Sequence, residues 1–162
     1  MIEENCRIGH GYDVHKLETG EKFVIGGIEI DHDKGAVGHS DADIIIHVMC
    51  DSILGALSEG DIGKHFPDTD EKYKGIDSKE LLLEVVEILH KKGFEINNID
   101  VTVLLQRPKL RNHIDEMIET LSAVMKIDKK KLSIKATTTE GLGFVGREEG
   151  VAAHCVTLIN KI

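Results

Sequence analysis

The chain has 162 residues, of which 41% are hydrophobic and 30% charged, and its formal net charge is −9. This length suits one domain with a sizeable core, so we expect a single domain over residues 1–162. The negative charge argues against a nucleic-acid-binding surface, and no apolar run reaches the roughly 18 residues of a membrane helix. Three cysteines without a CxxC pattern, and a start at Met1 without a signal-peptide pattern, favour a cytoplasmic protein with reduced thiols.

The first half of the chain is predicted to contain strands followed by one helix. Residues 7–14 form a strand, and residues 23–30 form a strand pair broken at Gly26-Gly27, where a tight hairpin is expected. A helix capped by Ser40 or Asp41 extends to about residue 57, because its apolar residues recur with a period close to 3.6. A polar loop then covers residues 59–76.

The second half alternates helices and strands. A helix opens at Asp77 or Ser78 and ends near Gly93, a strand covers residues 99–105, and another helix covers residues 110–125. Residues 132–136 and 151–159 are two closing strands, joined by a glycine-rich loop. This pattern predicts an α/β (α+β sandwich) fold: a mixed β-sheet with helices on one face, plus a small hairpin.

Two short patterns contain metal-binding residue types. In Asp13-Val14-His15, alternate residues of an extended chain point the same way, so the carboxylate and the imidazole can meet one ion. His47 lies in an apolar helical stretch, where a lone histidine is more often a buried structural residue than a ligand. Asp43 or Asp51 could orient its ring, or could simply be solvated.

Two loops carry further polar residues. Residues 61–70 could contact an anion or a ribose, although their chemistry alone favours a capped irregular loop. Residues 136–147 combine three threonines, Glu140, three glycines and Arg147, which suit phosphate and metal binding better than a plain hairpin connection does.

Taken together, these motifs resemble the 2-C-methyl-D-erythritol 2,4-cyclodiphosphate synthases of the non-mevalonate isoprenoid pathway. The resemblance covers nearly the whole chain, through residues 7–15, 39–43 with His47, 61–63, 66–70, 106–109, 137–140 and 143–147. It implies a homotrimeric lyase with active sites between subunits. It also implies a central cavity near Phe144 and Arg147 that is able to hold an isoprenoid diphosphate.

The resemblance also implies two metal sites. Asp13, His15 and His47 would hold one zinc ion per subunit and leave one tetrahedral position open. Glu140 would hold magnesium or manganese between the α- and β-phosphates, because such ions prefer oxygen ligands.

The implied reaction converts 4-diphosphocytidyl-2-C-methyl-D-erythritol 2-phosphate into the cyclic diphosphate and CMP. His39 and Thr138 would stabilise the transition state. Asp61, Gly63 and residues 66–70 would hold the ribose and methylerythritol ends, whereas residues 105–111 and Thr137 would surround the cytosine. The full set of implied substrate contacts is Asp13, His15, His39, Ser40, Asp61, Ile62, Gly63, Phe66, Pro67, Asp68, Thr69, Asp70, Leu105, Gln106, Arg107, Pro108, Lys109, Leu110, Arg111, Thr137, Thr138, Thr139, Glu140, Phe144 and Arg147.

Two other functions fit parts of the pattern. A zinc-dependent phosphomonoesterase would release inorganic phosphate instead of CMP. A non-catalytic nucleotide-binding trimer would bind CDP without a metal. The products and the metal dependence of binding distinguish these alternatives from the synthase.

Overall fold

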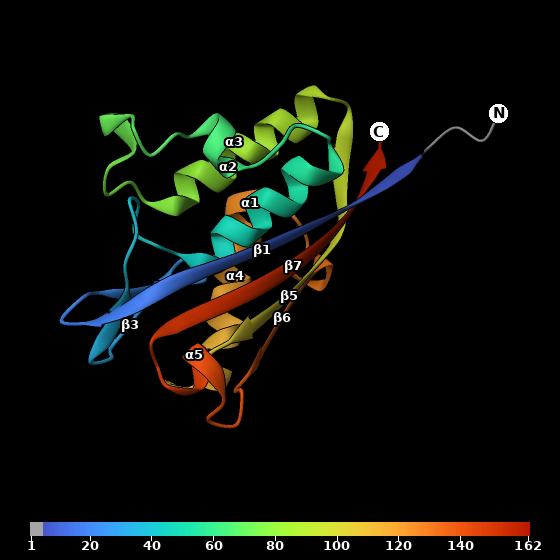
Figure 1. Cartoon of the computed structure of the whole chain (residues 1–162). Coiled ribbons are helices and arrows are strands. Elements are labelled where there is room, and N and C mark those ends of the chain that lie inside the picture. Colours follow the sequence, from blue (N-terminus) through green and yellow to red (C-terminus); the bar gives the residue numbers. More distant parts are fainter. Residues whose placement is uncertain (1–4) are drawn as a thin grey trace.

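The computed structural model describes residues 5–162, so the expectation for the segment at Met1 lies outside the described part (Figure 1). A five-stranded sheet has the order β4-β1-β7-β5-β6. Its strands are β1 (Cys6–Thr19), β4 (Lys34–Ala36), β5 (Phe94–Leu104), β6 (Leu132–Thr137) and β7 (Gly150–Lys161). Only β5 and β6 pair in parallel, so the sheet is mixed, as predicted.

A separate hairpin joins β2 (Phe23–Ile25) to β3 (Ile28–Ile30). Gly26 and Gly27 form its turn with φ values of +64° and +78°, a conformation that glycine adopts without steric cost. The predicted break at these two glycines is therefore confirmed.

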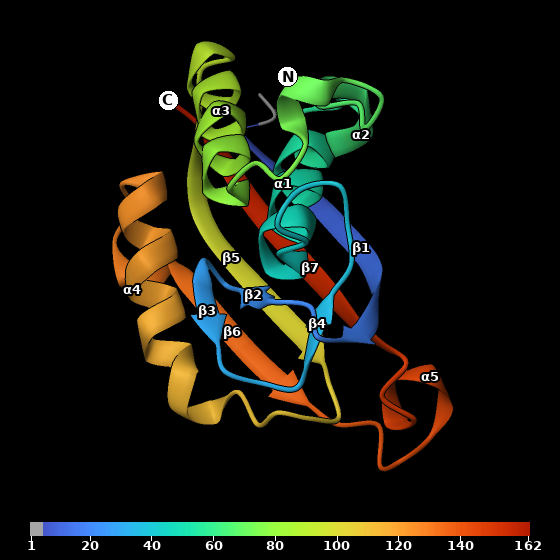
Figure 2. The same cartoon turned by 90° about the vertical axis from the view of Figure 1, so that its left-hand side faces the viewer.

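Three long helices cover one face of the sheet, whereas no helix within residues 5–162 covers the other face (Figures 1 and 2). They are α1 (Ile44–Ala56), α3 (Ser78–Lys91) and α4 (Ile114–Met125). The shorter elements are α2 (Ile62–His65), α5 (Gly143–Gly146), η1 (Glu71–Tyr73), η2 (Arg111–His113) and η3 (Lys129–Lys131). The predicted arrangement of helices on one face is confirmed.

The core lies between the sheet and these helices because each element has one apolar side. In α1, Ile44, Ile45, Val48, Ile53 and Leu54 are buried. In β1, Gly9 and Gly11 are buried while His10 and Tyr12 are exposed, which is the period-two alternation of a strand packed on one face.

Several predicted boundaries were wrong. Helix α1 is capped by Asp43, not by Ser40 or Asp41, since the Asp43 side chain accepts a hydrogen bond from the backbone of Ile46. Strand β1 continues to Thr19, and the predicted helix of residues 110–125 begins with the 3₁₀ turn η2. Among the described residues, no helix has the length and apolar character needed to cross a membrane.

Candidate metal and substrate site

Three side chains from two elements converge on one point between the sheet and helix α1. Oδ2 of Asp13 lies 2.9 Å from Nε2 of His15 and 3.4 Å from Nδ1 of His47. The two ring nitrogens lie 3.1 Å apart. These three residues are the only group of this kind among the described residues that could hold a metal ion. The predicted convergence of Asp13, His15 and His47 is confirmed.

Two glycines of β1 allow helix α1 to approach closely enough for this convergence. A Cβ atom on Gly9 would lie 1.9 Å from the carbonyl oxygen of Ser52, and one on Gly11 would lie 2.2 Å from that of Val48. Both distances are far below contact distance, so any larger residue would push α1 away from the sheet. The two glycines therefore place His47 within reach of Asp13 and His15.

Hydrogen bonds on the far side of each ring orient the histidines. Nδ1 of His15 lies 2.8 Å from the carbonyl oxygen of Ala42, which fixes Nδ1 as a donor and turns Nε2 toward Asp13. Nε2 of His47 lies 3.0 Å from Oγ of Ser40 and 3.3 Å from Oγ of Ser78. Such outer partners are typical of metal-binding histidines.

The electrostatics at this point favour a cation. Burial of the Asp13 carboxyl raises its pKa, but hydrogen bonds with His15 and His47 outweigh burial and hold the pKa well below its ordinary value. Burial lowers the pKa of His15, but the hydrogen bond with Asp13, the negative charge of Asp13 and the hydrogen bond with Ala42 together outweigh burial, so this pKa is raised. A positive charge is therefore stabilised between the carboxylate and the imidazoles.

The donor set fits a divalent metal ion. Ligand atoms about 2.0–2.1 Å from a tetrahedral ion lie roughly 3.3–3.4 Å from one another, close to the 2.9–3.4 Å observed here. One carboxylate and two imidazoles leave the fourth position open for a further ligand.

Two acidic residues considered as partners of His47 have other roles. Asp43 is fully buried, and its carboxylate accepts hydrogen bonds from the backbone N–H groups of Gly26 and Gly27 at 2.9 and 2.6 Å. Asp51 accepts from the backbone N–H of Ile62 at 2.7 Å. The hypothesis that either one orients the His47 ring is wrong. Ser78, which the sequence indicated only as a helix start, takes that place together with Ser40.

The residues proposed to surround the cytosine line a cavity of about 650 Å³. It lies where β6 ends and α4 begins, and its walls include Leu105, Gln106, residues 108–111, Thr137 and Thr138. Arg107 is not among the lining residues, because its guanidinium is paired with Glu148.

The glycine-rich loop begins at the edge of this cavity. The Thr138 hydroxyl accepts a hydrogen bond from the backbone N–H of Glu140 at 3.3 Å, which leaves its own O–H free to donate to a ligand. The Glu140 side chain is exposed, and its backbone φ is +54°. Phe144 and Arg147 lie in and just after α5, and Arg147 pairs with Glu149 at 2.8 Å.

The loop of residues 61–70 is built from small capped turns. Asp61 caps α2 through the backbone N–H of Lys64, and Asp70 caps η1 through that of Lys72. Phe66 packs edge-on against Tyr73, whereas Asp68 and Thr69 are exposed. The His39 ring reaches the carbonyl oxygen of Asp70 at 3.5 Å, so this loop adjoins the segment that leads into the metal-binding residues.

Strand register separates Asp13 from the cavity of about 650 Å³ within one chain. Asp13 lies opposite Ala153, Ala153 lies opposite Val103, and Val103 lies opposite Ala136. Three strand spacings of about 4.8 Å place Asp13 roughly 14 Å from Ala136. The two halves of the candidate site are therefore on the same sheet but not adjacent.

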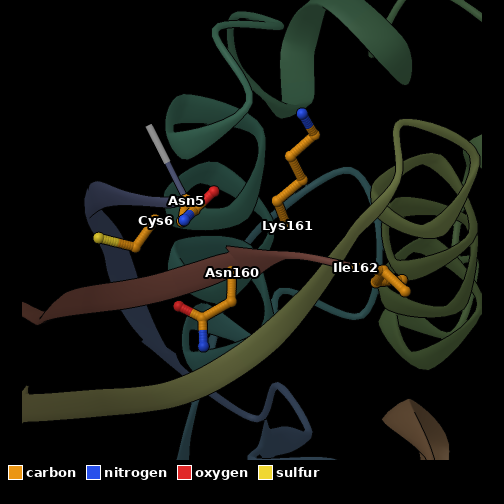
Figure 3. A pocket seen from close by; sticks show the side chains of 5 residues that line it. All are labelled: Asn5, Cys6, Asn160, Lys161 and Ile162. Atoms are coloured by element: carbon orange, nitrogen blue, oxygen red, sulfur yellow. The ribbon is translucent and has the colours of Figure 1, made fainter. Parts of the chain in front are cut away.

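Another cavity, of about 590 Å³, does not involve the candidate site. It lies at the ends of β1 and β7 and is lined by Asn5, Cys6, Asn160, Lys161 and Ile162. Figure 3 shows that these side chains point in different directions and do not meet at a common centre. No predicted site residue lines it.

Comparison with known proteins identifies the group to which this arrangement belongs. The profile of the YgbB family matches residues 6–160. A 2-C-methyl-D-erythritol 2,4-cyclodiphosphate synthase of Geobacter sulfurreducens is 54% identical over 155 residues, which cover 96% of this chain and 99% of that protein. The chain belongs to the YgbB family.

Solved structures of this family share the fold. An IspF–CDP complex from Plasmodium falciparum has a TM-score of 0.87 and 34% identity, over 98% of this chain and 97% of that one. The bifunctional IspDF of Campylobacter jejuni has a TM-score of 0.93 and 38% identity over 97% of this chain. The chain spans 42% of that larger protein. The YgbB fold is therefore shown over nearly all of the chain.

Proposed function

We propose that this YgbB-family chain is a 2-C-methyl-D-erythritol 2,4-cyclodiphosphate synthase. Its substrate is 4-diphosphocytidyl-2-C-methyl-D-erythritol 2-phosphate. An oxygen of the 2-phosphate forms a bond to the β-phosphorus, the bond from this phosphorus to the oxygen bridging it to the α-phosphate breaks, and CMP leaves with that oxygen. The observation that carries the proposal is the convergence of Asp13, His15 and His47 in a chain that matches synthases over nearly its full length.

No protein nucleophile is needed, because the attacking phosphate already carries between one and two negative charges near neutral pH. The task of the chain is to bring two anionic groups together. Asp13, His15 and His47 would hold zinc, and Glu140 would hold magnesium or manganese. When bound, these ions would neutralise the negative charge of the phosphates and polarise the phosphoryl oxygens.

The remaining groups bind and orient the substrate. Thr138 would donate its free O–H to a phosphate oxygen as negative charge shifts, and His39 would donate from the other side. Residues 105–111 and Thr137 would enclose the cytosine, and Asp61, Gly63 and the loop of residues 66–70 would hold the sugar and the methylerythritol. The cavity beside Thr137 and Thr138 supports the assignment of the cytosine.

We further propose that the working form is a homotrimer whose sites combine two subunits. The separation of roughly 14 Å between Asp13 and Ala136 supports this, because one substrate must reach both regions. The helix-free sheet face supports it too, since Ile8, Tyr12, Val14 and Val156 are exposed there. Phe144 and Arg147 remain predicted to lie near the trimer axis, beside the cavity for an isoprenoid diphosphate.

Phosphorus NMR tests the reaction directly. The folded, metal-loaded chain is incubated with the substrate and magnesium, and we expect signals of the cyclic diphosphate and of CMP. His47→Ala should abolish both, whereas His90→Ala, an exposed histidine of α3, should not. Release of inorganic phosphate alone would indicate a phosphomonoesterase, and CDP binding without any turnover would indicate a non-catalytic protein.

Subunit mixing tests the shared sites. Trimers of His47→Ala chains and trimers of Glu140→Gln chains should each be inactive. After they are dissociated together and reassembled, some sites should combine an intact metal-binding set with an intact Glu140, so activity should return. If mixed assemblies form but stay inactive, each site belongs to one chain.

A further inference from the structure

His10 and His154 form a pair of imidazoles on the helix-free face of the sheet. Nε2 of His10, on β1, lies 3.2 Å from Nδ1 of His154, on β7. His154 lies opposite Tyr12, which is two residues from His10, so all three side chains share one face. Both histidines are exposed, and they lie on the opposite side of β1 from Asp13 and His15, which face helix α1.

The pair is held by strands and by ring packing. The ring centroid of His154 lies 4.7 Å from that of Tyr12 and 5.4 Å from that of His10. The backbones of β1 and β7 are paired continuously on either side of these residues. The two ring nitrogens are therefore fixed close together by regular structure rather than by a loop.

The distance between these nitrogens suits chelation of one metal ion. Two nitrogens that are each about 2.05 Å from an ion and 3.2 Å from each other subtend an angle of roughly 100° at that ion. This value lies between the 90° of square-planar or octahedral geometry and the 109° of tetrahedral geometry. Imidazole ligands suit zinc, copper and nickel.

The cavity beside the pair has an uncharged lining, and neutral imidazole is the form of histidine that binds metals. A cavity of about 360 Å³ beside His154 is lined by Tyr12, Leu104, Phe144 and other uncharged residues, without an Asp, Glu, Lys or Arg among its described lining. A hydrogen bond between two neutral rings accounts for the same distance. An entering metal ion would take the place of the shared proton, which would move to the other nitrogen of the ring that donates it.

We propose that His10 and His154 chelate a divalent transition-metal ion of the zinc, nickel and copper class, separately from the site of Asp13, His15 and His47. The two rings occupy two coordination positions, and water or groups of neighbouring subunits occupy the others. The chelation requires one chain only. Its consequence, a metal-dependent gain in the stability of the assembly, rests on the trimer proposed above.

Metal stoichiometry tests the proposal in a His47→Ala background, which removes the other site. Calorimetric titration with nickel, checked by elemental analysis, should show one ion per chain. That ion should be lost in His47→Ala/His10→Ala and in His47→Ala/His154→Ala but kept in His47→Ala/His90→Ala. Equal stoichiometry with and without His154 would overturn the proposal.

A spectroscopic measurement on the unaltered chain covers the case in which a variant does not fold. After the site of His47 is filled with zinc, one equivalent of copper(II) per chain is added. We expect nitrogen splittings from two imidazoles in the electron paramagnetic resonance spectrum, and a spectrum of aquated copper contradicts the proposal. Turnover is measured separately, so an inactive chain that still binds this ion counts against the synthase proposal alone.

Discussion

Arg107 and Glu148 form a two-point ion pair that joins the segment beside the cavity of about 650 Å³ to the end of the glycine-rich loop. Nε and Nη2 of Arg107 donate to the two carboxylate oxygens at 2.6 and 2.9 Å. The neighbouring Gln106 accepts a hydrogen bond from the backbone N–H of Gly141 at 3.3 Å. Gln106 and Arg107 thereby contact the two ends of the segment 141–148. This segment begins directly after Glu140, two residues beyond Thr138.

Breaking this ion pair should affect substrate binding more than folding. Exposed pairs contribute little to stability, so Glu148→Gln should raise the KM for the cytidylylated substrate by about two- to fivefold, with kcat and the melting temperature nearly unchanged. Steady-state kinetics checks the expectation. The exchanged pair Arg107→Glu/Glu148→Arg should recover part of the loss if the link between the loops is what matters. No recovery would indicate that Arg107 contacts the substrate itself.

The same pair makes a small contribution to stability that depends on pH. The hydrogen bond from Arg107 lowers the pKa of Glu148 below its ordinary value of about 4.3. Because the folded-state pKa is lowered, the contribution is fully present above the unfolded value and is lost as the pH falls through the folded value. Melting curves of the parent and of Glu148→Gln should therefore differ slightly at pH 6, and the difference should disappear as the pH falls through the lowered pKa of Glu148. A difference that persists at low pH would rule out this charge effect.

Substitution of Gly11 should separate the metal-binding side chains. A Cβ atom there would lie 2.2 Å from the carbonyl oxygen of Val48, so Gly11→Ala forces α1 outward, at a cost of about 2–3 kcal/mol in the free energy of unfolding. His47 moves with α1, and zinc binding should fall as well. Chemical denaturation and metal analysis measure the two effects.

Gly55→Ala is the matched control, because Gly55 lies on the same helix and its added Cβ would only touch the carbonyl oxygen of His10, at 3.9 Å. It should keep metal binding and gain up to about 1 kcal/mol from the better helix propensity of alanine. Equal losses in both variants would mean that close packing of α1 on β1 is not what positions His47.

Much of the fold was predictable because long elements have clear apolar periodicity. The faces of α1, α3 and α4, the strand β5 and the break at Gly26-Gly27 could all be predicted from residue spacing. The strand β4 and the helices α2 and α5 span only three or four residues, so they leave no measurable period. Their positions depend on contacts with distant segments, such as the pairing of Gly35 with Glu18.

The candidate site was predictable only in part, for the same reason. Asp13-x-His15 shares one face of any strand, but which helical residue meets it depends on how α1 packs against Gly9 and Gly11. Ser40 and Ser78, 38 residues apart, meet at the His47 ring through tertiary packing. The predicted contact of Asp43 with the His47 ring was wrong. A carboxylate at a helix start can accept a hydrogen bond from an imidazole, from the first turn of the helix or from a neighbouring turn, and the sequence does not distinguish these partners.

The serines behind His47 should tune metal affinity without being ligands. Ser40→Ala and Ser78→Ala each remove a hydroxyl near Nε2 of His47, so zinc affinity should fall roughly 10- to 100-fold in the double variant. Competition with a chelating dye measures this. Ser133→Ala, on the exposed side of β6, is the control and should bind zinc like the parent chain. Unchanged zinc affinity in the double variant would mean that the serines do not orient His47 for metal binding. The contact between His15 and the Ala42 carbonyl would then be the outer hydrogen bond that supports the site.

Substitution of Asp43 should lower the free energy of unfolding more than most single substitutions in the chain. Its carboxylate caps α1 at Ile46 and accepts from both glycines of the β2–β3 turn, while the side chain is fully buried. Asp43→Ala loses a helix cap, worth about 1 kcal/mol, and leaves two N–H groups without their acceptor at about 1–3 kcal/mol each. We therefore expect a loss of roughly 3–7 kcal/mol in the free energy of unfolding.

Asp77→Ala is the control that separates the contribution of a helix cap from that of the hydrogen bonds with the β2–β3 turn. Asp77 caps α3 in the same way, through the backbone N–H of Lys79, but it is partly exposed and receives no bond from a distant turn. Its removal should cost about 1 kcal/mol in the same denaturation experiment. If the two variants lose equal stability, the bonds from Gly26 and Gly27 contribute nothing. A larger loss for Asp43→Ala instead assigns the excess to the link between the hairpin and α1, the helix that carries His47.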